Sequence, residues 1–213
     1  MDIPYICITL VKKHGEMLYW LNRIWVWMRR SRHSRGFGVQ SPWAYRFIRY
    51  VVNEHYPYYS YDDLKQEIPE LSSRERKMCR LYFRLANYRQ ADEMWSLDDD
   101  DRLSCAIRGY VQRACKKTKI TYTDRVQDFT TGRLEMLRIT PAVDMEAAIE
   151  KAIAAADTQS MVIVENIYKS PQAHRIWQQC EEDIRCITTF DLYECGIIFF
   201  DTKRYKEKYI VNF

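Results

Sequence analysis

The sequence predicts an α/β fold, in which a mostly parallel sheet ends in an antiparallel hairpin and is preceded by N-terminal helices. Between residues 41 and 90 the apolar residues recur at helical spacing. From residue 93 onward short apolar runs alternate with helical windows, which favours parallel strands joined by right-handed crossovers. After residue 186 the apolar runs follow one another closely, and this indicates an antiparallel hairpin at the sheet edge.

The composition is typical of a single main core. The chain has 213 residues, and 47% of them are hydrophobic. We expect an N-terminal helical region over residues 1–90 and a truncated doubly wound domain over residues 91–213. The net charge of +4 does not by itself require a nucleic-acid partner. The seven cysteines form no C-x-x-C pair, so we expect reduced thiols, no zinc site and a cytoplasmic location.

The N-terminal segment has the periodicity of an amphipathic helix, because Leu18, Leu21, Trp25 and Met28 fall on one stripe. Charged residues interrupt its apolar run, so we expect neither a transmembrane segment nor a secretory signal. The basic run RRSRHSR, Arg29 to Arg35, follows directly. Together these features suit a protein partner, an anionic membrane surface or the phosphate backbone of a nucleic acid. A helix packed on the core with a solvated linker is the plainer interpretation.

Cap residues locate three helices before the first strand. Ser41 and Pro42 suit the N-cap and the first position of one helix. The tyrosine-rich turn YPYYSYDD leads into a second helix. The third helix, SSRERKMCRLYFRLANYR, begins with Ser72 or Ser73.

The elements after residue 93 follow in a regular order. The expected strands are EMWSL, KITYT, LEMLRIT and SMVIVEN, and the expected helices between and after them are RLSCAIRGYVQRAC, DMEAAIEKAIAAAD and PQAHRIWQQCEED. The closing strands are CITTFDLY, GIIFFD and KEKYIVNF. The stretch DRVQDFTTGR between KITYT and LEMLRIT is too short for a helix and a strand, so we expect one crossover to be deleted.

Four segments resemble a small subfamily of class I S-adenosylmethionine-dependent methyltransferases. GVQSPWAYRFI resembles its G-x-H-S-P-F segment, with Gln40 and Trp43 in place of the histidine and phenylalanine. RLYFRLANY resembles its helix before the first strand, MVIVENIYKS its V-L-D-D-I-Y-W-S segment, and FDLYECGIIFF its D-L-F-x-x-G-I-x-F-F hairpin. The resemblance spans roughly residues 35 to 213. It implies a Rossmann-like methyltransferase fold with a cofactor site at the ends of the strands.

The glycine-rich turn of those enzymes is replaced by aspartates. In the family an acidic residue and a G-x-G-like turn follow the first strand, because glycine lets the backbone approach the cofactor. Here the turn reads Asp98, Asp99, Asp100, Asp101, whose side chains hinder that approach and repel the carboxylate of the cofactor. Three interpretations stand: capping of the helix that starts near Arg102, a divalent-metal site, or a remodelled cofactor site. No calcium-loop pattern accompanies the aspartates, so we expect no metal.

Two further positions matter for an S-adenosylmethionine site. The resemblance assigns Asp124, just past KITYT, to the ribose of the cofactor, and the deleted crossover removes one wall of the adenine pocket. Glu165 and Asn166 stand where related O-methyltransferases carry an acidic pair, so one charge is lost. If the site is active, its cofactor-binding residues are Asp98, Asp99, Asp124 and Glu165.

We expect no independent catalytic set. His174 with Glu165 or Asp191 is a formal acid-base pair, but no nucleophile motif accompanies it, and a solvated histidine is the plainer interpretation. Cys105 and Cys115 are expected to pack on a helix. Four tyrosines suit either a ligand mouth or a turn packed against the sheet: Tyr56, Tyr58, Tyr59 and Tyr61.

Two functions compete. The favoured one is a degenerate methyltransferase-like protein without a cofactor, which acts as a binding or scaffold module through the tryptophan-rich helix or the tyrosine turn. The alternative is an active S-adenosylmethionine-dependent methyltransferase with a remodelled cofactor site. We favour the first, because a fold alone does not establish a function and the changes fall on the site.

Overall fold

The computed structural model describes residues 24–99, 101–130 and 132–213, so the beginning of the expected tryptophan-rich helix lies outside the described residues. Residues 24–29 are helical. They are followed by the 3-10 turn η1 (Ser31–Gly36), helix α2 (Pro42–Phe47), the π-helical turn η2 (Ile48–Val52), α3 (Tyr59–Glu67) and α4 (Ser73–Arg89). The three helices expected before the first strand are therefore present, and the first of them ends in a π turn.

The α/β part begins directly after α4. Its elements are β1 (Glu93–Leu97), α5 (Arg102–Ala114), β2 (Lys119–Thr123), the short 3-10 turn η3 (Val126–Asp128), β3 (Leu134–Ile139), α6 (Met145–Ala155), β4 (Ala156–Glu165), α7 (Pro171–Glu182), β5 (Thr188–Asp191), β6 (Cys195–Phe199) and β7 (Glu207–Ile210). The order of strands and helices expected from the sequence is confirmed. The expected boundary at residue 90 falls between α4 and β1, and the division into two domains stays a prediction.

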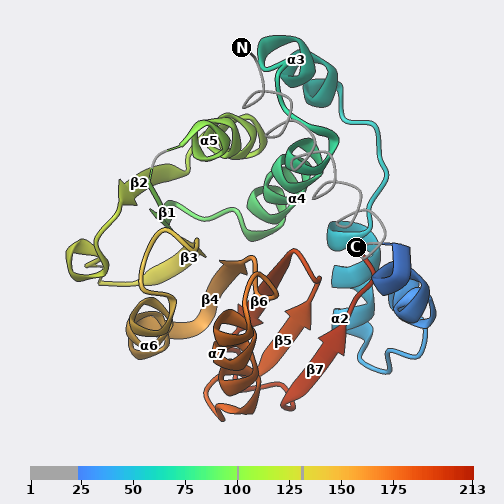
Figure 1. The fold of residues 1–213 in the computed structure, drawn as a ribbon, viewed down its shortest axis with the longest axis vertical. Helices are drawn as coiled ribbons and strands as arrows, with labels where there is room; N and C mark the ends of the chain where they lie inside the picture. The colour runs from blue at the N-terminus through green and yellow to red at the C-terminus, as the bar shows by residue number, and fades with distance from the viewer. Residues whose placement is uncertain (1–23, 100, 131) are drawn as a thin grey trace, which may run out of the picture.

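The seven strands form one sheet in the order β2-β1-β3-β4-β6-β5-β7 (Figure 1). β1, β2, β3 and β4 are parallel, whereas β6 runs antiparallel to both β4 and β5. The expected parallel sheet with an antiparallel end is confirmed. The last strand differs from a simple hairpin, because β7 pairs with β5 in parallel and closes the sheet at that edge.

The connection from β2 to β3 is short, as expected, and the deletion of a crossover stays a prediction. Among the described residues between these strands the only element is η3, and β2 is the edge strand of the sheet beside β1. A chain that leaves an edge strand must cross over its neighbour to reach the next position, and here it does so without a helix. The sheet therefore ends at β2 on this side.

Side-chain caps explain where the helices begin. Ser41 accepts a hydrogen bond from the amide of Ala44, and Pro42 occupies the first turn of α2, as expected. Ser72 and Glu75 form a reciprocal capping box at the start of α4. The sequence left open whether Ser72 or Ser73 begins the helix, and the structure shows that Ser72 is the N-cap.

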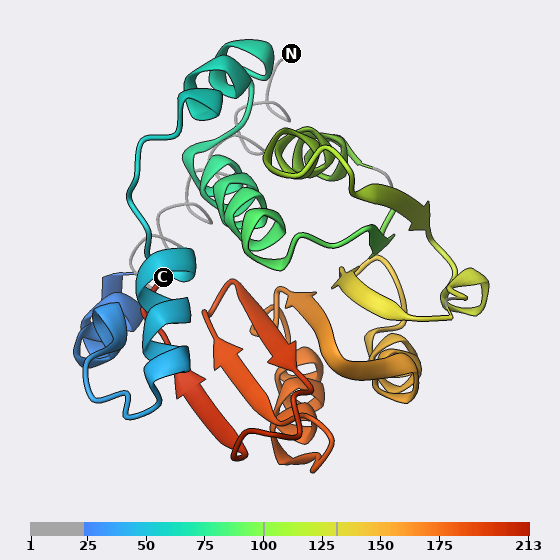
Figure 2. The same cartoon turned by 180° about the vertical axis from the view of Figure 1, so that it is seen from behind.

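Helices cover both faces of the sheet (Figure 2). On one face α2, α3, α4 and α5 share a buried cluster with strand residues such as Met94, Met136 and Ile163. On the other face α6 and α7 pack on residues such as Leu137 and Val164. Alternate strand residues thus serve opposite cores, as the pleat of a strand requires. No helix within the described ranges combines the length and the apolarity of a membrane span.

A close approach at Gly196 fixes how α7 packs on the sheet. Trp177 of α7 is fully buried and lies against this residue of β6. A Cβ at position 196 would stand 2.3 Å from the Trp177 ring, far inside van der Waals contact. The glycine of the FDLYECGIIFF segment is therefore a packing requirement between helix and strand.

Candidate functional site

The carboxyl ends of the parallel strands meet at one edge of the sheet, where such folds place ligands. Asp98 directly follows β1, Arg138 is the penultimate residue of β3, and Glu165 is the last residue of β4. The register pairs Ser96 of β1 with Arg138 of β3, so these side chains share the face covered by α4 and α5. Polar groups that are far apart along the chain thus lie close together at the strand ends.

Arg138 is the centre of a buried network at this edge, and its side chain is 2% exposed. Its Nη1 donates to Asp98 Oδ2 at 2.6 Å and to Ser104 Oγ at 2.8 Å. Its Nε donates to Glu165 Oε1 at 2.8 Å. One guanidinium therefore binds the acidic residues that follow two different strands.

Helix α4 completes the network through Tyr82. This tyrosine is fully buried, and its hydroxyl donates to Glu165 Oε1 at 2.7 Å. On the other side Ser96 donates its hydroxyl to Asp98 Oδ2. The strand-end network, which we define as Tyr82, Ser96, Asp98, Ser104, Arg138 and Glu165, is thus satisfied by protein groups from two helices and three strands.

The network holds two carboxylates against one guanidinium out of contact with water. Burial disfavours the charged form of Arg138, but Glu165, Tyr82 and Asp98 outweigh it, and the pKa of the guanidinium is raised above its usual value. Burial and the nearby Glu165 also raise the pKa of Tyr82 well above its usual value. Tyr82 therefore stays protonated and acts as a donor, so the network is an internal ion pair that is closed by hydrogen bonds.

The aspartates of the turn have separate fates. Asp101 caps α5, because its Oδ1 accepts from the amide of Ser104 at 2.8 Å. Asp99 is exposed, and Asp100 lies outside the described residues. Asp98 is 2% exposed and is no cap, since Arg138 holds it. The capping interpretation is therefore correct for Asp101 and wrong for Asp98.

Removing the cap separates these roles. We expect Asp101→Ala to lower the free energy of unfolding by about 1 kcal/mol, because the first turn of α5 loses its acceptor. Asp99→Ala removes an exposed carboxylate from the same turn and should change the stability very little. Urea denaturation of the two variants checks this, and equal losses would contradict the assignment of the cap.

Asp124 lies apart from the strand-end network. It follows β2, its side chain is 73% exposed, and its nearest cation is Arg125 at 4.0 Å. Asn166 follows Glu165 with a left-handed φ of 56°, and its Oδ1 accepts from Arg74 at 3.3 Å. Of the four residues expected to bind a cofactor, the structure joins Asp98 and Glu165 and leaves Asp99 and Asp124 exposed.

The carboxylates expected as partners of His174 are already bound. Asp191 Oδ1 and Oδ2 each lie 2.9 Å from a nitrogen of Arg30, and Tyr168 donates to Oδ2 at 2.6 Å. His174 instead stacks on the Tyr168 ring, with 4.4 Å between the centroids. Arg30 belongs to the basic run, so at least this cation is used inside the protein rather than toward a phosphate backbone.

Five cysteines are buried and form no disulfide: Cys79, Cys115, Cys180, Cys186 and Cys195. Cys115 is buried, as expected for a packing residue, whereas Cys105 is exposed and the packing expected for it is wrong. Because Cys105 follows Ser104 on α5, it turns away from the core face that the serine occupies. Within the described residues no group of three or more His, Cys, Asp or Glu side chains is placed to hold a metal ion.

Sequence reasoning missed the central residue, Arg138. The signal was present as an arginine inside the apolar strand LEMLRIT, at a position that alternation assigns to a buried face. A buried arginine requires an acidic partner. Asp98 and Glu165 are the natural partners, since Asp98 follows β1, Glu165 ends β4, and both strands pair with β3.

The chain matches no family model and no curated protein. Among solved structures it is similar to a methyltransferase from Geobacter sulfurreducens, with 13% identity, a TM-score of 0.46 and coverage of 74% of this chain and 97% of that chain. It is similar to the SAH-bound methyltransferase PaMTH1 from Podospora anserina, with 11% identity, a TM-score of 0.45 and coverage of 79% and 97%. A cofactor-bound protein from MTB has 13% identity, a TM-score of 0.40 and coverage of 67% and 88%. At this identity the likeness concerns the fold alone.

Proposed function

We propose that this chain is a degenerate methyltransferase-like protein that has lost S-adenosylmethionine binding and acts as a binding or scaffold module. The observation that carries the proposal is the position of Arg138 between Asp98 and Glu165. A ligand that displaced the guanidinium would leave buried carboxylates without their cation. Removing one partner of a buried ion pair typically costs about 3–5 kcal/mol. Two of the four acids expected to bind the cofactor, Asp98 and Glu165, are therefore committed to the fold.

The turn after β1 supports the same proposal. Asp98, Asp99 and Asp101 each carry a Cβ and a carboxylate where a cofactor would require close approach of the backbone. The start of α5 already has an anion, because the carboxylate of Asp101 binds the Ser104 amide. The carboxylate of S-adenosylmethionine would meet like charges and an occupied helix end. The residues present do not fit this cofactor.

Because the sheet ends at β2, a further part of the expected cofactor site is missing. β2 is the last strand on this side, and the turn η3 replaces the helix and strand that would wall an adenine ring. Asp124 alone retains an accessible carboxylate at the expected ribose position. One exposed acid gives little affinity, since its interactions are made in water.

The scaffold part of the proposal concerns the described end of the tryptophan-rich segment. Ile24, Trp25, Trp27 and Met28 are each more than half exposed. A contiguous apolar patch of this kind is typical of protein-protein contacts, in which tryptophan is enriched. We therefore propose a protein partner for this segment.

Calorimetric titration tests the loss of the cofactor. We expect neither S-adenosylmethionine nor S-adenosylhomocysteine to give a saturable heat below millimolar concentration, because Arg138 occupies the carboxylates. Near-ultraviolet circular dichroism of the same sample confirms that the protein is folded.

The active alternative makes the opposite prediction. Micromolar binding that Asp124→Ala abolishes and Asp128→Ala leaves intact would establish a remodelled cofactor site. Asp128 is a suitable control because it is an exposed aspartate of η3 on the same edge of the sheet. That outcome would overturn the proposal.

A further inference from the structure

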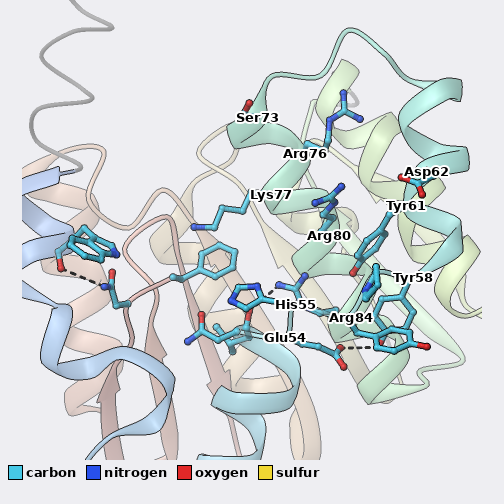
Figure 3. Close-up of a pocket in the computed structure, with 17 residues that line it drawn as sticks. Glu54, His55, Tyr58, Tyr61, Asp62, Ser73, Arg76, Lys77, Arg80 and Arg84 are labelled. Atoms are coloured by element: carbon cyan, nitrogen blue, oxygen red, sulfur yellow. Dashed lines mark hydrogen bonds between the residues drawn. The ribbon is translucent and has the colours of Figure 1, made fainter.

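A cavity of about 720 Å³ lies beside α4, between this helix, the tyrosine turn and the C-terminal residues (Figure 3). Its wall includes residues from five parts of the chain: Trp27, the segment 52–58, Tyr61 and Asp62 of α3, the α4 side that begins at Ser73, and the C-terminal pair Asn212 and Phe213. No member of the strand-end network lines it. The volume falls in the range of small-molecule sites, which is roughly 300–1,000 Å³.

The α4 wall of the cavity is basic. Arg76, Lys77, Arg80 and Arg84 all line it, and they recur at helical spacing along one side of α4. The close-up shows Arg76, Arg80 and Lys77 on the α4 side, with Tyr61 next to Arg80 and Tyr58 below it (Figure 3). Sequence reasoning followed only the apolar face of this helix and missed its basic face.

The acidic groups of the cavity do not neutralise this face. Glu54 and Asp62 also line the cavity, and Tyr58 donates its hydroxyl to Glu54 at 2.8 Å. Among the described residues no carboxylate lies within ion-pair distance of Arg76 or Arg80. The described residues that line the cavity therefore carry more positive than negative side chains, which attracts anions.

Two of these cations retain donors without an acceptor. Arg76 uses Nη2 to bind the carbonyl oxygens of Ile68, Pro69 and Leu71, but its Nη1 makes no hydrogen bond. Arg80 stacks over the Tyr61 ring at 4.9 Å, and its Nε makes no hydrogen bond. Both nitrogens are buried, so neither is available to a ligand in the cavity. The charge of the two guanidinium groups still acts on an anion there.

Aromatic residues also line the cavity. Tyr56 and Tyr58 meet edge to face, with 5.1 Å between their ring centroids, and Phe213 lies under the Lys77 ammonium at 4.1 Å. Planar rings bind such surfaces by stacking. Of the tyrosines expected either to line a ligand mouth or to pack against the sheet, Tyr56, Tyr58 and Tyr61 line the cavity, and Tyr59 is 90% exposed.

We infer that this cavity binds a nucleoside phosphate, with the phosphate near Lys77 and Arg80 and the base against the tyrosines of the wall. A phosphate fits better than a carboxylate, because it carries about two negative charges and three acceptor oxygens, which matches several convergent cations. The bonds of Arg84 to the carbonyl oxygens of Val51 and Val52, at 2.5 and 2.9 Å, hold the end of η2 against α4 and so fix the shape of the cavity. This site is separate from the strand-end network.

Calorimetry with ADP as the probe, on the full chain at low salt, tests the inference. We expect saturable micromolar binding, and we expect Lys77→Gln and Arg80→Gln each to weaken it about tenfold, because each removes a charged donor to phosphate. The matched control is Lys65→Gln, which removes an exposed charge on α3 that does not line the cavity and should leave the affinity unchanged. Affinity should fall steeply as salt is raised.

Fragment probes decide the chemical class. Adenosine alone should bind far more weakly than ADP, and pyrophosphate should bind with intermediate affinity. No ADP binding, equal binding of ADP and adenosine, or no effect of Lys77→Gln and Arg80→Gln would each overturn the inference. If a 5′-phosphorylated oligonucleotide bound more than about tenfold tighter than ADP, the ligand would be the end of a nucleic acid and the inference of a small ligand would be wrong. Since ADP and S-adenosylmethionine are titrated separately, failure here leaves the proposed loss of the cofactor intact.

Discussion

Replacing Arg138 by methionine is expected to lower the free energy of unfolding by about 3–5 kcal/mol, because it leaves buried carboxylates without their cation. Asp98 and Glu165 are both less than a tenth exposed, and each hydrogen-bonds the guanidinium directly. Methionine matches the length of the arginine stem, so packing changes little and the electrostatic effect dominates. Urea denaturation monitored by circular dichroism measures the change.

Two controls isolate the ion-pair contribution of Arg138. Arg133→Met removes an arginine that is 55% exposed and pairs with Asp157 at 3.2 Å, so it should cost less than about 1 kcal/mol. Combining Arg138→Met with Asp98→Asn and Glu165→Gln should recover much of the lost stability, since neutral groups are cheaper to bury. An Arg138→Met variant as stable as Arg133→Met would contradict the role of the network.

The second large effect is expected at Gly196. Gly196→Ala should lower the free energy of unfolding by about 3 kcal/mol, because the new methyl group overlaps the Trp177 ring in a packed core. β6 lies between β4 and β5, so its backbone cannot move without disturbing both neighbours. The midpoint of thermal unfolding should fall accordingly.

A matched glycine and a rescue variant test the cause of this loss. Among the described residues outside the helix backbone, the nearest atom to a Cβ added at Gly109 of α5 is a Leu64 side-chain carbon at 3.9 Å, so Gly109→Ala should keep or slightly raise the stability through its better helix propensity. Trp177→Leu should make Gly196→Ala much less costly than it is in the original chain. Strictly additive losses at the two positions would show that overlap with the tryptophan is not the cause.

Local features were predictable from the sequence, because they depend on neighbours along the chain. The caps at Ser41 and Ser72, the alternation of strands and helices and the short connection from β2 to β3 all follow from spacing and side-chain chemistry within a few residues. The absence of glycine after β1 could also be seen directly in the sequence. What happened to the aspartates was only half predictable, since capping by Asp101 is local and burial of Asp98 is not.

The sequence by itself determined the α/β layout, the antiparallel end of the sheet and the loss of the glycine turn. Only the tertiary structure decided the partners of Arg138, which are 40 residues away at Asp98 and 27 residues away at Glu165. It also decided the parallel pairing of β7 with β5 and the cavity between α4 and the tyrosine turn. Periodicity tells which face of an element is buried, but contacts between elements depend on how the whole sheet and its helices assemble, and no local spacing encodes them.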